Sequence, residues 1–273
     1  MSESKLLGAK ADAKSLGDQY HNSSKLQART NLHIKYASGE PWWPFVARTA
    51  ALPAGASVLD LGCGPGWMWD GGQSDFPPGL MLTLADISQG MIDEALARVG
   101  KIGRYASVEG QVADASALTF ADASFDAVLA CHMLYHLPDP GRALDEIARV
   151  LKPGGIVAVT TNDGDNLRLM YDLGAQVFGG TGGDPSGAVF DLATARELVS
   201  ARFDDVTVSY CPGELAVTDG EALVDALTSY PPGDSASETQ LSDLRGLIAE
   251  HMTAGNGVVR IPKLTGMVRG IKR

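Results

Sequence analysis

The sequence lacks the features of membrane proteins and of disulfide-bonded proteins. No apolar run in its 273 residues approaches the ~18 residues that a membrane span requires. The first residues, MSESKLLG, contain no apolar stretch typical of a signal peptide. Three widely separated cysteines, Cys63, Cys131 and Cys211, form no Cys-x-x-Cys pair, which excludes a disulfide framework and a cysteine-based zinc site. We therefore expect a cytoplasmic protein with reduced thiols and no membrane association.

Positive charge is also scarce. The chain has 22 Lys and Arg against 33 Asp and Glu, a net charge of −11, and residues 37–256 hold thirty of the acidic and only eleven of the basic residues. Such an acidic body repels phosphate backbones, which argues against DNA binding and disfavours RNA. The two ends are mildly basic. We interpret them as solvated termini, although they could touch an anionic substrate.

The glycine-rich segment DLGCGPG, residues 60–66, lacks two common phosphate-binding signatures. The dinucleotide motif GxGxxG would need glycine where the chain has Trp67, and the Lys-Ser/Thr pair of the P-loop is absent. What the segment has is glycine at positions 62, 64 and 66, directly after an apolar run. Without Cβ atoms a ligand can lie against the backbone, and we expect the amide groups of the loop to be free to contact it.

Short apolar runs alternate with helical patterns along the chain, and glycine is abundant at 32 of 273 residues. This alternation predicts an α/β fold with a parallel sheet covered on both faces. Strands are predicted at 57–61, 81–85, 107–113, 125–130, 156–161, 206–211 and 267–271. Helices are predicted at 88–100, 139–151, 192–203, 220–229 and 238–253. Gly179 to Gly187 is predicted as a flexible surface loop.

We expect one domain over residues 1–273. Residues 53–162 would form its cofactor-binding core. Residues 1–52 would be a helical N-terminal cap, and residues 163–273 would add the remaining strands with a helical insertion, because these helices exceed what a minimal sheet domain needs. The extra helices are expected to cover the strand ends.

Three acidic residues follow the first three predicted strands of the core. Asp60 precedes the glycine loop, Asp86 ends the second strand and Asp114 follows the third. Ligands of such sheets bind at the carboxyl ends of the strands, where a carboxylate can accept bonds from both hydroxyls of a ribose. Three carboxylates and no basic residue favour a cationic nucleoside over a pyrophosphate. S-adenosylmethionine, with its positive sulfonium, is such a nucleoside.

Five segments in order, DLGCGPG, LTLADIS, VADAS, FDAVLACHMLYHLPD and RVLKPGG, resemble a class I S-adenosylmethionine-dependent methyltransferase. Among these the chain is most similar to the type 11 domain, the group that includes menaquinone- and ubiquinone-pathway enzymes. The resemblance covers about residues 55–162. It implies a Rossmann-like, doubly wound, seven-stranded and mostly parallel sheet with helical N-terminal and C-terminal additions.

The resemblance also implies roles for individual residues. For S-adenosylmethionine, the resemblance places Gly62, Gly64 and Gly66 at the methionine part, with Asp60 near its amino group. Asp86 would bind the ribose and Ile87 would flank the adenine. Asp114 and Ala115 would bind the adenine edge, and Cys131 would contact the cofactor through its backbone. An N-terminal segment of related enzymes folds over the cofactor, so Tyr20 could contact cofactor or substrate.

Methyl transfer depends mainly on alignment and exclusion of water, so a general base is optional. His136 is the first candidate for that base and His132 the second, since both follow the fourth strand of the core. The alternative for His136 is a packing role. The i, i+4 spacing of the pair resembles a metal site, but Met133 replaces the glutamate of HExxH and a third ligand is missing, so we expect no metal.

The acceptor is expected to be a small, partly apolar molecule methylated at O, N or C. The Asn/Asp-Pro-Pro-aromatic motif of nucleic-acid amino-methyltransferases is absent after the fourth strand, and Cys131 lacks the preceding proline of RNA cytosine methyltransferases. Two alternatives stay open. One is a tRNA nucleoside as the acceptor, and the other is a cofactor-binding protein without methyl transfer. A homodimer is also left open.

Overall fold

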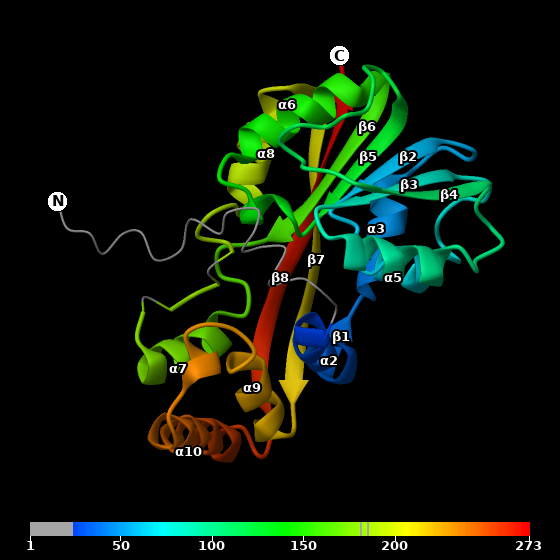
Figure 1. The fold of residues 1–273 in the computed structure, drawn as a ribbon. Coiled ribbons are helices and arrows are strands. Elements are labelled where there is room, and N and C mark those ends of the chain that lie inside the picture. Colours follow the sequence, from blue (N-terminus) through cyan, green and yellow to red (C-terminus); the bar gives the residue numbers. More distant parts are fainter. Residues whose placement is uncertain (1–23, 181, 185) are drawn as a thin grey trace.

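The first half of the chain alternates strands and helices, as the apolar runs predict. Figure 1 shows the computed structural model, which describes residues 24–180, 182–184 and 186–273. The strands are β1 (Ala37–Gly39), β2 (Ser57–Leu61), β3 (Met81–Asp86), β4 (Ser107–Val112), β5 (Phe125–Cys131), β6 (Leu151–Asn162), β7 (Phe203–Val217) and β8 (Val259–Lys272). The helices are α2 (Ser24–Tyr36), α3 (Trp42–Ala50), α4 (Trp67–Gly71), α5 (Gln89–Val99), α6 (Pro140–Val150), α7 (Arg168–Phe178), α8 (Leu192–Ser200), α9 (Gly220–Leu227) and α10 (Glu238–Ala254), with short 3-10 turns η2 (Leu134–His136) and η3 (Gly233–Ser235).

All described strands belong to one sheet in the order β1-β7-β8-β6-β5-β2-β3-β4. β4, β3, β2, β5 and β6 are parallel, whereas β8 is antiparallel to both β6 and β7. One face packs on α3, α4 and α5 in a buried cluster that contains Phe45, Trp69 and Val99. The other face packs on α6 and α8 around Leu144 and Val199. The fold is therefore the mostly parallel, doubly covered α/β sheet expected from the sequence.

Helix starts follow the capping residues. The Ser88 side chain accepts a hydrogen bond from the Met91 amide and begins α5, and the Asp139 side chain accepts from the Arg142 amide and begins α6 with Pro140 at its first turn. Both caps satisfy backbone N–H groups that have no partner inside the helix. These two helix starts were predicted correctly.

The expected number of seven strands is wrong, because the described residues form a sheet of eight strands. The additional strand is β1, which pairs antiparallel with β7 from Ala37 opposite Leu215 to Gly39 opposite Gly213. β1 has only three residues, Ala-Ser-Gly, none of which is favoured in strands, so no local pattern announces it. It forms because β7 runs far beyond the end of β6 and presents an unpaired edge there.

β7 and β8 are also much longer than predicted. They pair from Phe203 opposite Lys272 to Val217 opposite Val259. Their far halves pack against α2, α7, α9 and α10 in a third buried cluster, which we call the distal cluster and which includes Tyr36, Leu173 and Ile261. In Figure 1, α7, α9 and α10 gather at the lower end of β7 and β8. The extra helices thus have a core of their own.

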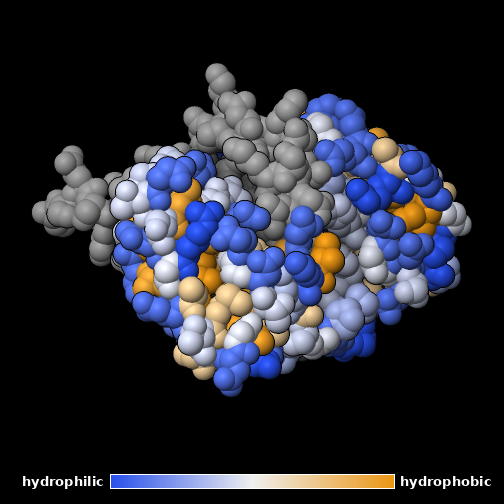
Figure 2. All heavy atoms as spheres, turned by 90° about the horizontal axis from the view of Figure 1, so that it is seen from below, coloured by the Kyte–Doolittle hydropathy of each residue, from blue (hydrophilic) through white to orange (hydrophobic). Residues whose placement is uncertain are grey.

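The end of the molecule that carries α10 has a mixed surface. Figure 2 looks at the molecule from this side and shows hydrophobic groups as separate areas in a largely hydrophilic surface. α10 begins with a capping box in which Ser237 and Gln240 bond each other's backbone N–H groups. Among the described helices, none is both long enough and apolar enough to cross a membrane.

Candidate functional site

Four strand ends meet at one edge of the sheet. β2, β3, β4 and β5 are parallel, so their carboxyl ends lie side by side. Asp60 of β2 is in register with Leu84 of β3, and Asp86 at the end of β3 is in register with Val112 of β4. The strand order therefore brings the acidic residues predicted for the site to a common edge.

The glycine loop after β2 uses its amide groups within the protein. The Gly62 and Cys63 amides donate to the Ala85 carbonyl at 2.7 and 3.0 Å, and the Gly64 amide donates to Oδ2 of Asp86 at 3.0 Å. The Gly66 amide donates to the Cys63 carbonyl. The expectation of free amides is thus wrong, because the end of β3 takes up most of these donors. The loop can therefore provide a ligand with room and with carbonyl oxygens, but with few free N–H groups.

The three glycines of this loop have different surroundings. All three have positive φ values, 73° at Gly62, 50° at Gly64 and 76° at Gly66. A Cβ atom on Gly62 would lie 2.7 Å from Cβ of Met133, and one on Gly66 would lie 2.8 Å from Cγ2 of Val99. A Cβ atom on Gly64 would meet nothing within 4 Å. Open space therefore lies beside Gly64, while the other two glycines allow close packing.

Asp60 is a buried carboxylate that is only half satisfied. Its side chain is 2% exposed, and Oδ2 accepts a hydrogen bond of 2.8 Å from the Trp69 indole. Oδ1 has no hydrogen-bond partner among the described residues. Burial, together with the nearby charge of Asp86, raises the pKa of Asp60 to about 7. A buried oxygen without a partner is costly, and a donor or cation placed beside it would remove that cost.

Asp86 is held by two backbone N–H groups. Oδ2 accepts from Gly64 and Oδ1 accepts from Ser88, both at 3.0 Å. Burial raises its pKa from the ordinary value, and these hydrogen bonds partly offset the rise. The next residue, Ile87, is 36% exposed, so an apolar side chain stands open beside a fixed carboxylate. This pair suits the sugar and the base of a nucleoside.

Asp114 and Ala115 begin the loop between β4 and β5. Asp114 is exposed and its Oδ1 accepts from the Ser116 amide at 2.8 Å, whereas Ala115 is 5% exposed and packs in the cluster beneath α6. The position of this loop is fixed by three side chains of α6, which we call the α6 clamp: Arg142, Glu146 and Arg149.

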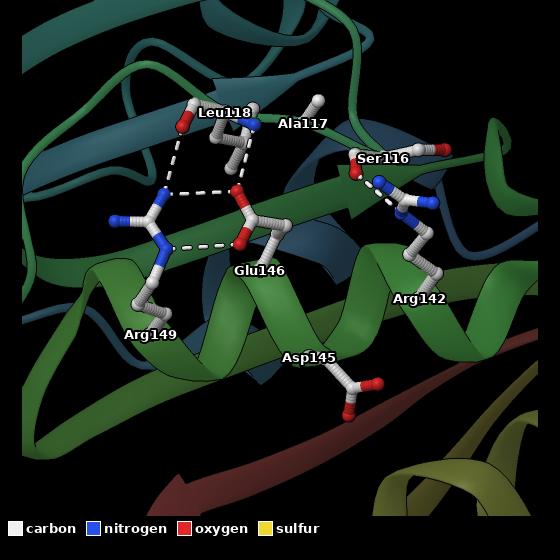
Figure 3. Close-up of a pocket in the computed structure, with 7 residues that line it drawn as sticks. All are labelled: Ser116, Ala117, Leu118, Arg142, Asp145, Glu146 and Arg149. Atoms are coloured by element: carbon white, nitrogen blue, oxygen red, sulfur yellow. Dashed lines mark hydrogen bonds and ion pairs between the residues drawn. The ribbon is translucent and has the colours of Figure 1, made fainter.

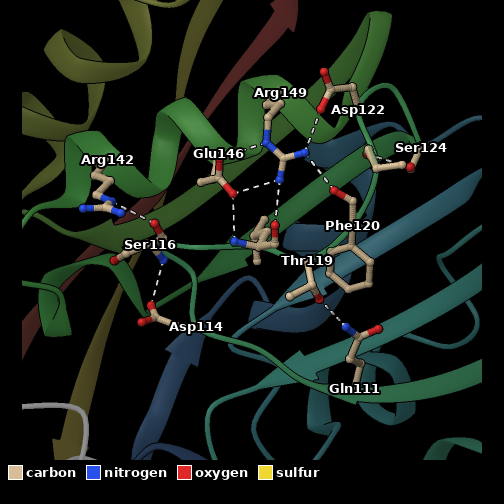
Figure 4. A network of polar contacts seen from close by, with 12 residues as sticks. Gln111, Asp114, Ser116, Thr119, Phe120, Asp122, Ser124, Arg142, Glu146 and Arg149 are labelled. Atoms are coloured by element: carbon tan, nitrogen blue, oxygen red, sulfur yellow. Dashed lines mark hydrogen bonds and ion pairs between the residues drawn. The ribbon is translucent and has the colours of Figure 1, made fainter.

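The α6 clamp bonds the loop backbone at several points (Figures 3 and 4). Nε of Arg142 donates to the Ser116 carbonyl, and Oε2 of Glu146 accepts from the Leu118 amide at 2.7 Å. Arg149 donates to the Leu118 and Phe120 carbonyls, to both oxygens of Glu146 and to Asp122. The clamp lines a surface cavity of about 460 Å³. The α6 clamp ties the loop that begins at Asp114 to α6.

The end of β5 carries Cys131 and His132. Burial strongly raises the pKa of Cys131, so its thiol is neutral, and Sγ lies 3.6 Å from Sδ of Met68. His132 has a φ of 52°, and its amide donates to the Thr160 carbonyl. This left-handed backbone turns the chain at the strand end. The neutral thiol of Cys131 does not suit nucleophilic catalysis.

His132 belongs to a group of rings and cations above the strand ends. Its ring lies 5.2 Å from the Trp42 ring, and Nζ of Lys263 lies 5.4 Å from the same indole. Burial, with the charge of Lys263 adding to it, lowers the pKa of His132 to about 4 and that of His33 to about 4. Both imidazoles are therefore neutral at pH 7. A neutral imidazole with this pKa is a weak proton acceptor.

The other candidate base lies one turn further along the chain. His136 ends η2, and its ring packs edge-on against Tyr135 with 4.6 Å between the centroids. Its charge contributes to the lowered pKa of His132, which places the two histidines in one electrostatic environment. Tyr20, the remaining predicted contact, lies outside the described residues.

Three residues of this region were not assigned by the sequence. Trp69 supports Asp60, and its position two residues into α4 gives no local sign of that role. Lys263 lies in a strand that was predicted too short. Asp184 falls in the glycine-rich stretch interpreted as a surface loop, yet it is 5% exposed and accepts hydrogen bonds from Asn162 and Asn166. Only long-range pairing reveals these contacts.

Comparison with known proteins identifies the family. Residues 59–159 match the family described as "Methyltransferase domain". Methyltransferase ucsB of Acremonium sp is 30% identical over 240 residues, which cover 80% of this chain and 80% of that protein. The chain belongs to the class I S-adenosylmethionine-dependent methyltransferases. The family resemblance of the sequence is thus confirmed.

Other relatives of this methyltransferase match it over shorter lengths. Demethylmenaquinone methyltransferase of Clavibacter sepedonicus is 35% identical over 53% of this chain and 58% of that protein. O-methyltransferase resE of Aspergillus sclerotiorum is 41% identical over 39% of each protein. The chain thus spans from about two fifths to three fifths of the length of these two relatives.

Solved structures share the fold of this methyltransferase at low sequence identity. The [4+2]-cyclase SpnF has a TM-score of 0.59 and 20% identity over 95% of this chain and 96% of its own. Phosphoethanolamine N-methyltransferase 2 of Haemonchus contortus, solved with S-adenosyl-L-methionine, has a TM-score of 0.58 and 20% identity over 97% of this chain and 60% of its own. These TM-scores support a common fold, and one fold can carry different activities.

Proposed function

We propose that the protein transfers the methyl group of S-adenosylmethionine to a small, partly apolar metabolite at O, N or C. One observation carries the proposal. Oδ1 of Asp60 is buried without a partner among the described residues, and the loop that follows Asp60 has open space beside Gly64. An ammonium group is the ligand chemistry that satisfies such an oxygen, and the amino group of the cofactor supplies one.

The other predicted contacts fit the rest of this cofactor. Asp86 is fixed at the end of β3 with lone pairs left to accept from ribose hydroxyls, and exposed Ile87 would lie against the adenine. Asp114 and Ala115 would read the adenine edge from the loop held by the α6 clamp. When bound, the cofactor supplies an electrophilic methyl carbon whose bond to sulfur breaks with the electron pair staying on sulfur.

The chain's own residues would then align the acceptor and exclude water from it. Trp42 and His132 cover the end of β5, and the helices of the distal cluster cover the far halves of β7 and β8. We propose that all these parts act as one domain over residues 1–273. His136 remains the first candidate for a base, and the low pKa of His132 makes that residue the weaker candidate.

A small-molecule acceptor is favoured by the nature of the relatives and by the pairing of basic residues. One relative is named for demethylmenaquinone, a small molecule. The C-terminal Arg260 and Arg273 pair with Glu214 and Asp204, so they do not form an open patch for an RNA backbone. Salt-dependent binding of tRNA would instead support the nucleic-acid alternative.

The first experiment measures cofactor binding and transfer separately. Isothermal titration with S-adenosylmethionine and its demethylated thioether should give binding that Asp86→Ala weakens by roughly 2–3 kcal/mol, since two charge-assisted hydrogen bonds are lost. Incubation of the protein with methyl-labelled cofactor and a metabolite extract should yield labelled products by mass spectrometry. Wild-type affinity in Asp86→Ala would remove the ribose assignment.

A second candidate is a protein that binds the cofactor without transferring its methyl group. The [4+2]-cyclase SpnF favours this candidate, because its fold matches along nearly the whole of both chains although it is named for a different reaction. Tight cofactor binding with no labelled product from any fraction of the extract would support it. Labelled product that depends on His136 would exclude it.

A further inference from the structure

The basic residues of the C-terminal strand differ in how they are paired. Residues 257–273 hold five basic side chains and no acidic one. Four of the five bond within the chain: Arg260 with Glu214, Arg269 with the Ala50 carbonyl, Lys272 with the Leu151 carbonyl, and Arg273 with Asp204. The side chain of Lys263 has no hydrogen bond and no ion pair with any described residue. It is the exception in an otherwise fully paired set.

Lys263 lies at the same edge of the sheet as the proposed site. β6 ends at Asn162, which is in register with Thr265 of β8, so Lys263 lies two residues beyond the end of β6. Alternate residues of β8 share a face, and Met267 of this face belongs to the cluster beneath α3. The Lys263 side chain accordingly reaches Trp42 at the start of α3.

Three elements surround the ammonium group of Lys263. Trp42 lies beneath it. The positive charge of Lys263 also contributes to the lowered pKa values of the neutral imidazoles of His33 on α2 and His132 after β5. Burial lowers the pKa of Lys263 itself. The carboxylate of Asp184, whose charge acts on His132, is already occupied by Asn162, Asn166 and Ser186. No described carboxylate therefore balances this partly buried cation.

The surroundings of the Lys263 ammonium group make its burial costly without an anion, and they favour the binding of one. A partly buried ammonium loses hydration, and its contact with one indole recovers only part of that loss. Neutral imidazoles can donate an N–H to an anionic oxygen, and an indole face packs on a planar ring. The group thus has one cation, two possible donors and a flat apolar surface.

We propose that Lys263 binds a negatively charged oxygen of the acceptor, so that the substrate is a planar organic acid, either a carboxylate or an acidic enol. This inference rests on the proposed methyl transfer and adds the charge of its acceptor. An acceptor that arrives ionised needs no base when its lone pair attacks the methyl carbon, which agrees with the weak basicity of His132. Lys263 is then a specificity-determining residue.

The test uses the full chain with three variants. Lys263→Met removes the charge and keeps the length of the side chain, Lys263→Arg keeps the charge, and Lys101→Met makes the same change at an exposed lysine after α5. Each variant is first titrated with the demethylated cofactor to show that it is folded. A metabolite extract is separated by anion exchange at pH 8 into anionic and other fractions, and each fraction is then incubated with methyl-labelled cofactor.

We expect the label to enter the anionic fraction. For the purified acceptor, Lys263→Met should raise KM at least tenfold with a smaller change in kcat, and Lys263→Arg and Lys101→Met should stay within about threefold of wild type. Mild base then separates two forms of the acceptor. Release of labelled methanol shows that a carboxylate oxygen is methylated. Label that is stable to base shows transfer to another atom, either the enol oxygen or an atom of an acceptor that the acid only anchors.

Three results would overturn the inference. Label confined to the neutral or cationic fractions would leave methyl transfer in place and remove the anionic acceptor. A wild-type KM in Lys263→Met, with intact cofactor binding, would show that the lysine does not bind the acceptor. Cofactor binding without label in any fraction would overturn the proposed transfer and, with it, the role of Lys263.

Discussion

Nε1 of Trp69 donates a hydrogen bond of 2.8 Å to Oδ2 of Asp60, and both side chains are buried. Trp69 is itself fixed, because Phe76 and Tyr105 pack against its ring and the Tyr105 hydroxyl donates to its carbonyl. The indole therefore sets the direction of the carboxylate, and the second oxygen of Asp60 is left for a ligand. A residue of α4 thus shapes the site that we propose at the end of β2.

Trp69→Phe should destabilise the protein and weaken cofactor binding together. The ring can still pack, but Asp60 loses its one hydrogen bond, which costs about 2 kcal/mol for a bond to a charged group. Urea unfolding and isothermal titration measure the two effects. Trp43→Phe is the matched control, since Trp43 contacts the same buried cluster. Equal loss of cofactor affinity in both variants would show that Trp69 acts only through packing.

The stability of the free protein should depend on the protonation of Asp60. Burial raises its pKa to about 7, above the ~3.9 of an unfolded chain. The folded state then binds the proton more tightly, so this contribution to stability is complete below pH 4 and is lost as the pH rises from 4 through 7. Other carboxylates also titrate, so the informative quantity is the difference between wild type and Asp60→Asn.

That difference should change steadily between pH 4 and pH 8 in urea titrations, with wild type losing stability relative to Asp60→Asn as the pH rises. Cofactor affinity should change in the opposite direction, because the ionised carboxylate is the form that pairs with an ammonium group. Parallel stability curves for the two proteins would mean that Asp60 is already ionised throughout this range.

Gly62→Ala should mainly lower the stability of the protein, whereas Gly64→Ala should mainly lower its affinity for the cofactor. Both positions have positive φ, which costs an alanine about 1–2 kcal/mol. At Gly62 the new Cβ also meets Cβ of Met133 at 2.7 Å, so the free energy of unfolding should fall by a further ~1–3 kcal/mol. Met133→Ala should restore part of this lost stability. At Gly64 the new Cβ enters open space, so the fold should persist while cofactor affinity falls. Unchanged affinity in Gly64→Ala would move the ligand away from this loop.

The core of the fold was predictable because its signals are local. Five apolar runs between 57 and 161 correspond to β2 through β6, and Ser88 and Asp139 begin the helices that they were expected to cap. Turn and cap residues act over three or four positions, so a single sequence contains the information. The same holds for the order of Asp60, Asp86 and Asp114 along the strand ends.

The parts that were wrong or missed depend on long-range pairing. β1 exists only because β7 is long, and the length of β7 is set by its pairing with β8 and by the distal cluster. The amides of the glycine loop were expected to be free, yet they bond to Ala85 and Asp86 of a neighbouring strand. The contact between Lys263 and Trp42 joins residues more than 200 positions apart, which no local pattern can reveal.

His136→Ala should lower turnover at least tenfold with little change in cofactor affinity for an acceptor whose methylated atom carries a proton, because a positioned base contributes ~10²–10⁴ to a rate. For a carboxylate or enolate oxygen that arrives ionised, the same variant should keep its turnover. His132→Asn should have a smaller effect on proton removal, since burial lowers the pKa of His132 to about 4. Rates from pH 5 to 8 with saturating cofactor measure both. Turnover that is unaffected by His136→Ala would leave that histidine a packing role beside Tyr135.

Arg149→Met should weaken cofactor binding several-fold although Arg149 touches no proposed cofactor contact. The guanidinium bonds the carbonyls of Leu118 and Phe120 and orients Glu146, whose carboxylate accepts from the Leu118 amide. Without it the loop that begins at Asp114 loses its attachment to α6 and must be ordered when the adenine binds, which reduces affinity. Arg196→Met on the exposed side of α8 is the control. An enthalpy and affinity equal to wild type in Arg149→Met would show that the loop is held by its apolar contacts beneath α6.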